Sequence, residues 1–299
     1  MKILVIGAGV IGSNLAYNLS RSNDVTIMAR SNYEEIKEHG ITLSNRRKRK
    51  NFRVKVINEL LSDDIYDAIF VTFRTNQVEN MKSTLIQNKS KTVIFVGNNL
   101  EAEKYMEIPG KVVLFGFYFA AGYRHDGIVD GIDLHRITIG TTDGTDAYDA
   151  FIRELFAGTK IKVSIQNKMN DFLKSHGCGI LPYAFACYKA EGVLKNIKKD
   201  KEYSYKVVDA CRETYDVLKK LGYEILPKGE YNNVTKRRAL FAFITRWEFG
   251  SWIGQVCIAN HAMHAREEFL HMDRIFLEMR EQAGIKTPVY DELRKALII

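Results

Sequence analysis

The chain has 299 residues, of which 46% are hydrophobic, and a formal net charge of +8. This length predicts two domains, each large enough to bury a core. No apolar stretch approaches the ~20 residues that span a bilayer, and the N-terminus has neither a basic leader nor a cleavage site. We therefore expect a cytoplasmic protein with no membrane partner. The four cysteines are widely spaced without a C-x-x-C pair, which indicates reduced thiols rather than disulfides or a zinc site.

An apolar run at residues 2–6 leads directly into a G-x-G-x-x-G motif. A strand before this motif and a helix after it, expected at 10–21, are typical of a dinucleotide-binding turn. Gly7 permits the tight turn, Gly9 lets the backbone approach a pyrophosphate, and Gly12 lets the helix pack against the strand. The free N–H groups at the helix start would hold the phosphates. The residues expected at the coenzyme here are Gly7, Gly9, Val10, Ile11 and Gly12.

The second expected strand, 24–29, indicates which dinucleotide is preferred. In this fold its end lies beside the adenosine ribose, where Asp or Glu favours NAD and Arg accommodates the 2′-phosphate of NADP. Arg30 and Ser31 follow the strand, and no acid occurs before Glu34. Because a guanidinium can pair bidentately with a phosphate, we predict NADP(H) rather than NAD(H). The alternative is that Arg30 merely extends into solvent.

Strand and helix patterns alternate along the first half of the chain. The expected strands are 2–6, 24–29, 66–72, 92–96 and 111–116, and the expected helices are 10–21, 77–86 and 145–157. Residues 116–140 are rich in glycine, aromatic and β-branched residues, and we expect two or three antiparallel strands there. Alternation with short connections predicts an α/β domain with a Rossmann-type, doubly wound parallel sheet.

Positive charge is densest at residues 46–50, between two further expected strands at 40–44 and 53–57. A nucleic-acid site would need interleaved aromatic residues or a recognisable module, and the chain has neither, so we expect no nucleic-acid partner. The run is either a solvated hairpin or loop, or a source of positive potential near the NADP phosphate.

Long helical windows replace the strand signals from about residue 166. They cover 168–190, 203–222, 236–249 and 259–283. We therefore predict an NADP-binding domain at 1–165 and a helical substrate and catalytic domain at 166–299. In such an arrangement the substrate is expected between the domains, beyond the carboxyl ends of the strands.

Three segments of the first domain carry a resemblance to a known family. One is the glycine motif followed by residues 25–30. Another is the strand 67–73 with Arg74 at its end and Gln77 three residues later, and a third is the strand 93–97 followed by Asn98. Two segments of the second domain extend the match, namely residues 171–174 and the stretch from Glu268 to Pro288.

Across most of its length the chain resembles the ketopantoate reductase (2-dehydropantoate 2-reductase) family, as a distant member. The resemblance implies a Rossmann domain followed by a helical domain like that of 6-phosphogluconate dehydrogenase. It also implies an NADP-dependent oxidoreductase that reduces a 2-oxo acid to a 2-hydroxy acid. The most direct expectation is reduction of 2-dehydropantoate to pantoate in pantothenate biosynthesis.

The resemblance also assigns roles to individual residues. Lys174 corresponds to the catalytic lysine, which would polarise the substrate carbonyl and act as general acid. Asn98 would hydrogen-bond the substrate or nicotinamide, and Glu268 would bind the substrate's hydroxyl end. Arg74 stands where the family has a lysine and, with Gln77, would flank the adenosine end. The alternatives are a solvated Lys174, a turn-forming Asn98 and a surface-paired Glu268.

The substrate half of the chain departs from the family pattern. Lys174 is followed by Ser-His-Gly-Cys instead of a stretch with two substrate-binding asparagines, and the family's serine before the acidic helix is not evident at 254–258. Two alternative functions therefore stay open: a paralogous NADP-dependent reductase of another oxo or imino acid, or a non-catalytic NADP(H)-binding sensor. The sequence also leaves the oligomeric state open, a homodimer included.

A histidine-rich segment near the C-terminus needs separate consideration as a metal site. On one continuous helix, His261, His264, Glu268 and His271 would lie along a single stripe. The pattern is not H-E-x-x-H, no further ligand cluster is evident, and the family needs no metal. We therefore predict no metal centre.

Overall fold

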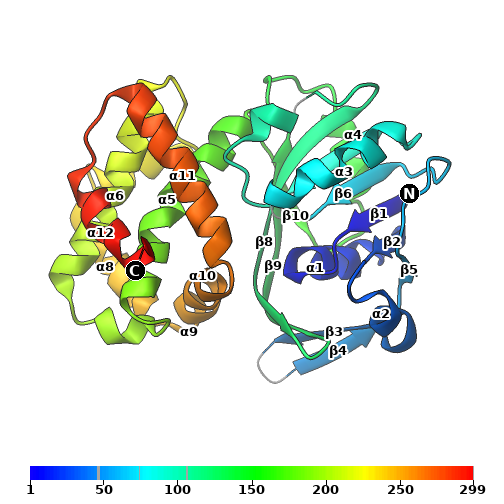
Figure 1. The fold of residues 1–299 in the computed structure, drawn as a ribbon, viewed down its shortest axis with the longest axis horizontal. Helices are drawn as coiled ribbons and strands as arrows, with labels where there is room; N and C mark the ends of the chain where they lie inside the picture. The colour runs from blue at the N-terminus through cyan, green and yellow to red at the C-terminus, as the bar shows by residue number, and fades with distance from the viewer. Residues whose placement is uncertain (46–47, 74, 106, 299) are drawn as a thin grey trace. The chain divides into compact units, whose positions relative to one another are not determined.

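The computed structural model describes residues 1–45, 48–73, 75–105 and 107–298, with the backbone but not the side chains of 75–80. The chain divides into two compact units, Met1–Met169 and Asn170–Ile299 (Figure 1). This division lies a few residues after the boundary that the change in sequence pattern suggests, and each unit is described by itself below.

The first unit is built on one sheet, whose described strands are mostly parallel. Its strands are β1 (Lys2–Ile6), β2 (Asp24–Met28), β3 (Ile41–Asn45), β4 (Lys48–Phe52), β5 (Lys55–Ile57), β6 (Ala68–Val71), β7 (Thr92–Val96), β8 (Val112–His125), β9 (Ile128–Gly140) and β10 (Lys162–Ile165). They lie in the order β4-β3-β9-β8-β7-β6-β1-β2-β5, and β10 pairs with β9. Among the described pairs only β3–β4 and β8–β9 are antiparallel. The predicted fold class, a parallel α/β sheet followed by a helical region, is confirmed.

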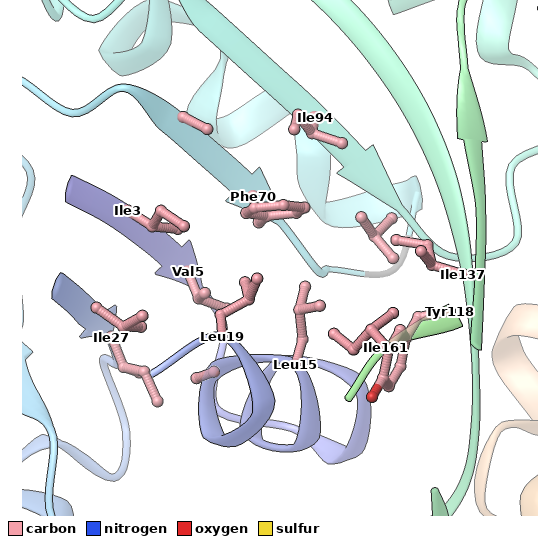
Figure 2. Close-up of a cluster of buried hydrophobic side chains, with 14 of the residues drawn as sticks. Ile3, Val5, Leu15, Leu19, Ile27, Phe70, Ile94, Tyr118, Ile137 and Ile161 are labelled. Atoms are coloured by element: carbon pink, nitrogen blue, oxygen red, sulfur yellow. The ribbon is translucent and has the colours of Figure 1, made fainter. Parts of the chain in front are cut away.

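Helices connect the parallel strands of this unit. They are α1 (Val10–Leu19), α2 (Tyr33–His39), α3 (Thr75–Gln87) and α4 (Asp149–Leu155), with a short 3₁₀ turn at Ala102–Tyr105. The sheet curves around α1, so that β8 and β9, the β3–β4 hairpin and β1 surround it (Figure 1). Leu15 and Leu19 of α1 pack against a fully buried core that includes Val5 and Ile27 (Figure 2). Burying such side chains contributes about 1.5–3 kcal/mol each.

The sheet differs from the sequence-based prediction in one place. The expected strand at 111–116 continues as the 14-residue strand β8, which pairs in parallel with β7 and then antiparallel with β9. An Asp126–Gly127 turn with positive φ at both residues closes this hairpin. The described part of the basic run belongs to a hairpin, one of the two alternatives expected for it, because Lys48–Lys50 form most of β4 and pair antiparallel with β3. Cross-strand pairing with β3, rather than propensity, decides that segment.

The second unit is helical. Its elements are α5 (Met169–Lys189), which starts at the unit boundary, a 3₁₀ turn at Leu194–Ile197, α6 (Lys201–Lys220), α7 (Glu230–Val234), α8 (Arg238–Phe249), α9 (Trp252–Gly254), the π-helical segment η3 (Gln255–Asn260), α10 (His261–His264), α11 (Arg266–Ala283) and α12 (Pro288–Ile298). The buried Glu213 carboxylate accepts hydrogen bonds from the N–H groups of Val289 and Tyr290, and so caps α12. No helix among the described residues has the length and apolar character needed to cross a membrane.

The histidine stripe is not formed as the sequence pattern suggested. Residues 259–283 are not one helix, because Ala265 leaves helical geometry at φ −124°, ψ 28° between α10 and α11. The break removes the constant 3.6-residue period that would align His261 and His264 with Glu268 and His271. In the part of the chain that the structure describes, no group of three or more His, Cys, Asp or Glu side chains could hold a metal ion.

Candidate active site

The glycine turn between β1 and α1 has the geometry that its motif requires. Gly7 has φ +108°, and its N–H donates to the Met28 carbonyl at 2.9 Å. A Cβ on Gly12 would lie 1.9 Å from the Gly7 carbonyl oxygen, so only glycine lets α1 start this close to β1. A Cβ on Gly9 would meet nothing within 4 Å, which leaves open space beside the first turn of α1. Val10 and Ile11 form the first helical residues, and no acidic side chain lies in that turn.

A cavity of about 430 Å³ opens at this turn, at the carboxyl ends of β1, β2 and β6. It is lined by Ile6, Gly7, Ala8, Gly9, Met28, Ala29, Arg30, Ser31, Asn32, Thr72, Phe73, Met81 and Arg124. The start of a helix offers unpaired N–H groups and a positive dipole to an anion. A pyrophosphate therefore fits the open space beside Gly9, and the residues present suit a dinucleotide.

The end of this cavity next to β2 contains the predicted cation. Arg30 is largely exposed, and its guanidinium reaches the Met81 sulfur at 3.1 Å. Ser31 and Asn32 follow it along the rim, and no Asp or Glu occurs among the lining residues. Without a carboxylate to accept bonds from both ribose hydroxyls, the rim offers groups that suit a 2′-phosphate.

The other residues predicted in this unit are only partly described. Asn98 lies two residues after the end of β7, at the same sheet edge as the glycine turn, because β1, β6 and β7 are parallel neighbours. It is half-buried, whereas the next residue, Asn99, uses its side-chain oxygen to accept the Glu101 N–H at 2.9 Å. Asn99 thus forms a local turn bond. Arg74, and the side chain of Gln77, lie outside the described residues.

Lys174 lies near the start of α5 in the helical unit and is only 2% exposed. Its ammonium group lies 5.2 Å from the centre of the Tyr223 ring, within cation–π range. Burial raises the pKa of the Cys178 thiol, one turn later, to about 12, and the nearby Lys174 charge opposes that shift. Lysines are rarely buried so deeply without a specific role or partner, so the solvated-lysine alternative is not what this structure shows.

Glu268 and His176 also belong to the helical unit. Glu268 is half-buried in the first turn of α11, where a carboxylate is favoured by the helix dipole. His176 stacks on Phe172 with ring centres 6.3 Å apart. Burial, and then the charge of His261, lower the pKa of His176 to about 4. His176 is therefore a neutral imidazole at pH 7. Its ring stacks on Phe172, whereas the Lys174 ammonium faces the Tyr223 ring.

The segment that contains the glycine turn also matches a family model. Residues 3–144 match the sequence model described as ketopantoate reductase PanE/ApbA. This part of the chain is therefore similar to ketopantoate reductases. No protein of curated function matches it by sequence at a significant level.

Solved structures of similar fold extend over the whole chain. The probable 2-dehydropantoate 2-reductase panE of Bacillus subtilis is 16% identical with a TM-score of 0.74, over 100% of this chain and 99% of that one. A D-mandelate dehydrogenase bound to NADH and anilino(oxo)acetate is 16% identical with a TM-score of 0.77, over 100% and 97%. The dimeric ketopantoate reductase of Staphylococcus aureus is 14% identical with a TM-score of 0.72, over 100% and 98%. At these identities the likeness establishes the fold.

Arg124 is the residue of this ketopantoate reductase fold that sequence reasoning missed. It lies near the end of β8, yet it lines the cavity beside the glycine turn. Its guanidinium donates to the Ala8 carbonyl at 2.8 Å and to the Glu35 carboxylate of α2 at 3.1 Å. No local pattern marks this arginine, because more than 110 positions separate it from Ala8 and only the long β8–β9 hairpin brings them together.

Proposed function

We propose that this protein is an NADPH-dependent reductase that converts a 2-oxo acid into a 2-hydroxy acid. The observation that carries the proposal is the cavity at the glycine turn, which combines an open helix start with a rim that contains Arg30 and no carboxylate. This combination suits a dinucleotide with an additional phosphate on its adenosine ribose. The match of residues 3–144 to the ketopantoate reductase family model supports the reaction class.

The residues of the sheet unit would hold the coenzyme. The N–H groups at the start of α1 would bind the pyrophosphate beside Gly9, and Arg30 would pair with the 2′-phosphate. Arg74 and Gln77 would flank the adenosine end, and Asn98 would orient the nicotinamide or the substrate. NADPH, when bound, supplies the hydride that reduces the carbonyl carbon.

The helical unit would supply the proton and part of the substrate site. We propose that the ammonium group of Lys174 donates a hydrogen bond to the substrate carbonyl and then transfers a proton to that oxygen. Its burial next to Tyr223 supports this role, because a desolvated cation stabilises developing negative charge more strongly than a solvated one. Glu268 would accept a hydrogen bond from a hydroxyl on the substrate.

The preferred substrate is 2-dehydropantoate, which would place the enzyme in pantothenate biosynthesis. The alternative is another oxo or imino acid, and one specific observation favours it. Ser175, which follows Lys174, donates to the Glu224 carbonyl at 3.3 Å and accepts from the Leu226 N–H at 3.1 Å. This hydroxyl is thus used to hold a loop, so the segment after Lys174 does not reproduce the family's substrate-binding asparagines.

Steady-state kinetics with a panel of 2-oxo acids and both coenzymes test this proposal. We expect turnover of 2-dehydropantoate with NADPH and much lower kcat/KM with NADH. Turnover of a different oxo or imino acid, without turnover of 2-dehydropantoate, would favour a paralogous reductase of that acid. NADPH binding without turnover of any panel member would select the non-catalytic sensor.

We also propose that the protein is a homodimer. The exposed side of α8 presents Leu240, Phe243, Ile244 and Trp247 at helical spacing, each between 38% and 64% exposed; these four residues are termed the α8 face. Contiguous apolar patches of this kind are unusual on monomers and typically mark protein–protein contacts. The Staphylococcus aureus relative, which is described as dimeric, adds support.

A further inference from the structure

A second cavity of the sheet unit, of about 910 Å³, is lined by residues of α1, of β3 and β4, and of β9. Figure 1 shows the β3–β4 hairpin next to α1. This second cavity shares no lining residue with the cavity at the glycine turn. Its volume is at the upper end of what small-molecule sites occupy, roughly 300–1,000 Å³. The proposed reductase activity does not use this cavity.

The walls of the second cavity come from the β3–β4 hairpin, α1 and β9. Lys48 and Lys50 are alternate residues of β4, so both occupy the same side of the hairpin. Tyr17, on α1, forms the opposite wall, and the Lys50 ammonium lies 5.7 Å from its ring centre. Asp133 and His135 are alternate residues of β9 and form the third wall. Two lysines, an imidazole and an aromatic ring therefore border one space.

His135 is held in an unusual backbone conformation. Its φ is +49°, a region where glycine is unstrained and a histidine costs free energy. It lies in an irregular part of the β8–β9 ladder. One residue of β8 separates Tyr118 from Ala120, whereas three residues of β9 separate their partners, Ile137 and Asp133. Non-glycine residues in such conformations cluster at functional sites.

The Asp133 carboxylate fixes this histidine in place. It accepts the Tyr118 hydroxyl at 2.8 Å, the Asn18 amide at 2.7 Å and the His135 backbone N–H at 2.8 Å. The His135 ring nitrogen Nδ1 lies 2.9 Å from the same carboxylate. These donors stabilise the Asp133 carboxylate, which is only 11% exposed. The two ammonium groups of Lys48 and Lys50 outnumber this carboxylate, so the lining carries net positive charge.

We propose that this cavity binds an organic phosphate of about nucleotide size, separately from the coenzyme. Lys48 and Lys50 would hold the phosphate groups, since ammonium groups are effective phosphate donors, and the second ring nitrogen of His135 would accept a hydrogen bond from a hydroxyl or amine of the organic part. Tyr17 and Leu43 would contact the organic part. The combination of positive charge, an aromatic ring and a hydrogen-bonded carboxylate favours a phosphate ester over an apolar or cationic ligand.

The probe for this site is ADP, titrated calorimetrically into the protein saturated with NADPH, with inorganic phosphate as a second probe. We expect one ADP per chain, and at least tenfold weaker binding after Lys48→Gln/Lys50→Gln. The matched control, Lys55→Gln/Lys162→Gln, removes two exposed lysines of the same unit outside both cavities, and it should leave ADP binding unchanged.

His135→Gly provides a variant that should fold normally, because glycine adopts φ +49° without strain. Its melting temperature should equal or exceed that of the wild type, while ADP binding weakens at least threefold. Absence of ADP binding, or binding that the lysine variant leaves unchanged, would overturn the proposal. ADP binding that Arg30→Ala removes and the lysine variant retains would also overturn the proposal, since ADP would then occupy the coenzyme cavity. Equal affinity for inorganic phosphate would refute the nucleotide-sized ligand.

Discussion

At the scale of single residues, the side chains proposed for catalysis and coenzyme selection are few and act locally. Lys174 is buried within the helical unit, whereas Arg30 is exposed at the rim of the cavity at the glycine turn. A buried ammonium group and an exposed guanidinium suit different tasks, namely proton donation in a desolvated site and capture of a mobile phosphate. Substitution of each should therefore affect a different kinetic parameter.

Replacing Lys174 tests the proton donor. Lys174→Ala removes the only group that we assign to protonate the substrate oxygen, so kcat should fall by about 10²–10⁴-fold. NADPH affinity, measured by fluorescence titration, should change by less than about threefold, because the lysine is not assigned to the adenosine phosphate. A variant that retains wild-type kcat would exclude Lys174 from the reaction.

Replacing Arg30 tests coenzyme preference. A charge-assisted hydrogen bond contributes about 1.5–3 kcal/mol, so Arg30→Ala should raise the KM for NADPH by roughly ten- to a hundredfold and change the KM for NADH little. Arg53→Ala, a change at another exposed arginine of the unit, is the control. Equal losses for both coenzymes would show that Arg30 does not recognise the 2′-phosphate.

His176 makes the stability of the helical unit depend on pH. Burial and the charge of His261 lower its pKa to about 4, against about 6.5 in the unfolded chain. The folded protein thus binds this proton more weakly than the unfolded protein, and stability is lost as the pH falls from about 6.5 through about 4. Melting temperatures between pH 7 and pH 4.5 should fall less steeply for His176→Gln. Parallel curves for the two proteins would contradict this assignment.

At the scale of elements, the β8–β9 hairpin supports the glycine turn of a distant element. Arg124 of β8 connects the Ala8 carbonyl to Glu35 of α2. The hairpin turn packs on the same carboxylate, because a Cβ on Gly127 would lie 2.0 Å from a Glu35 oxygen. The position of the glycine turn therefore depends on a strand that lies far away in the sequence.

Arg124 should act by positioning this turn. Arg124→Gln removes a guanidinium that makes two hydrogen bonds, so we expect about tenfold weaker NADPH binding with kcat within about threefold of wild type. Arg124→Lys should restore part of the affinity through the retained charge. Arg153→Gln, at an exposed site on α4, is the matched control. If Arg124→Gln lowered kcat and left NADPH binding unchanged, Arg124 would instead contribute to the chemical step.

At the scale of the whole molecule, the α8 face predicts self-association. Phe243→Glu and Trp247→Glu place charges within an apolar surface, which disfavours its burial against a second copy. Light scattering after size exclusion should give a dimer for the wild type and a monomer for these variants. Arg237→Glu, at the exposed N-terminal end of the same helix, should stay dimeric. A monomeric wild-type protein would refute the proposed homodimer.

Local signals predicted much of the fold. The strand, glycine turn and helix at residues 2–19 follow from backbone requirements that neighbouring residues alone impose, which is why Gly7, Gly9 and Gly12 were recognisable. The helical windows likewise matched α5, α6 and α8 closely. The prediction at 259–283 was wrong because a helical hydrophobic pattern does not reveal a single break such as Ala265.

By itself, the amino-acid order determined the class of fold, the dinucleotide motif and the expected cation at Arg30, because each depends on contacts within a few residues. Tertiary structure decided which distant groups meet, including Arg124 at the glycine turn and Asp133 of β9 at Asn18 of α1. Those encounters depend on strand register and sheet curvature, which many weak interactions set together and no short segment encodes.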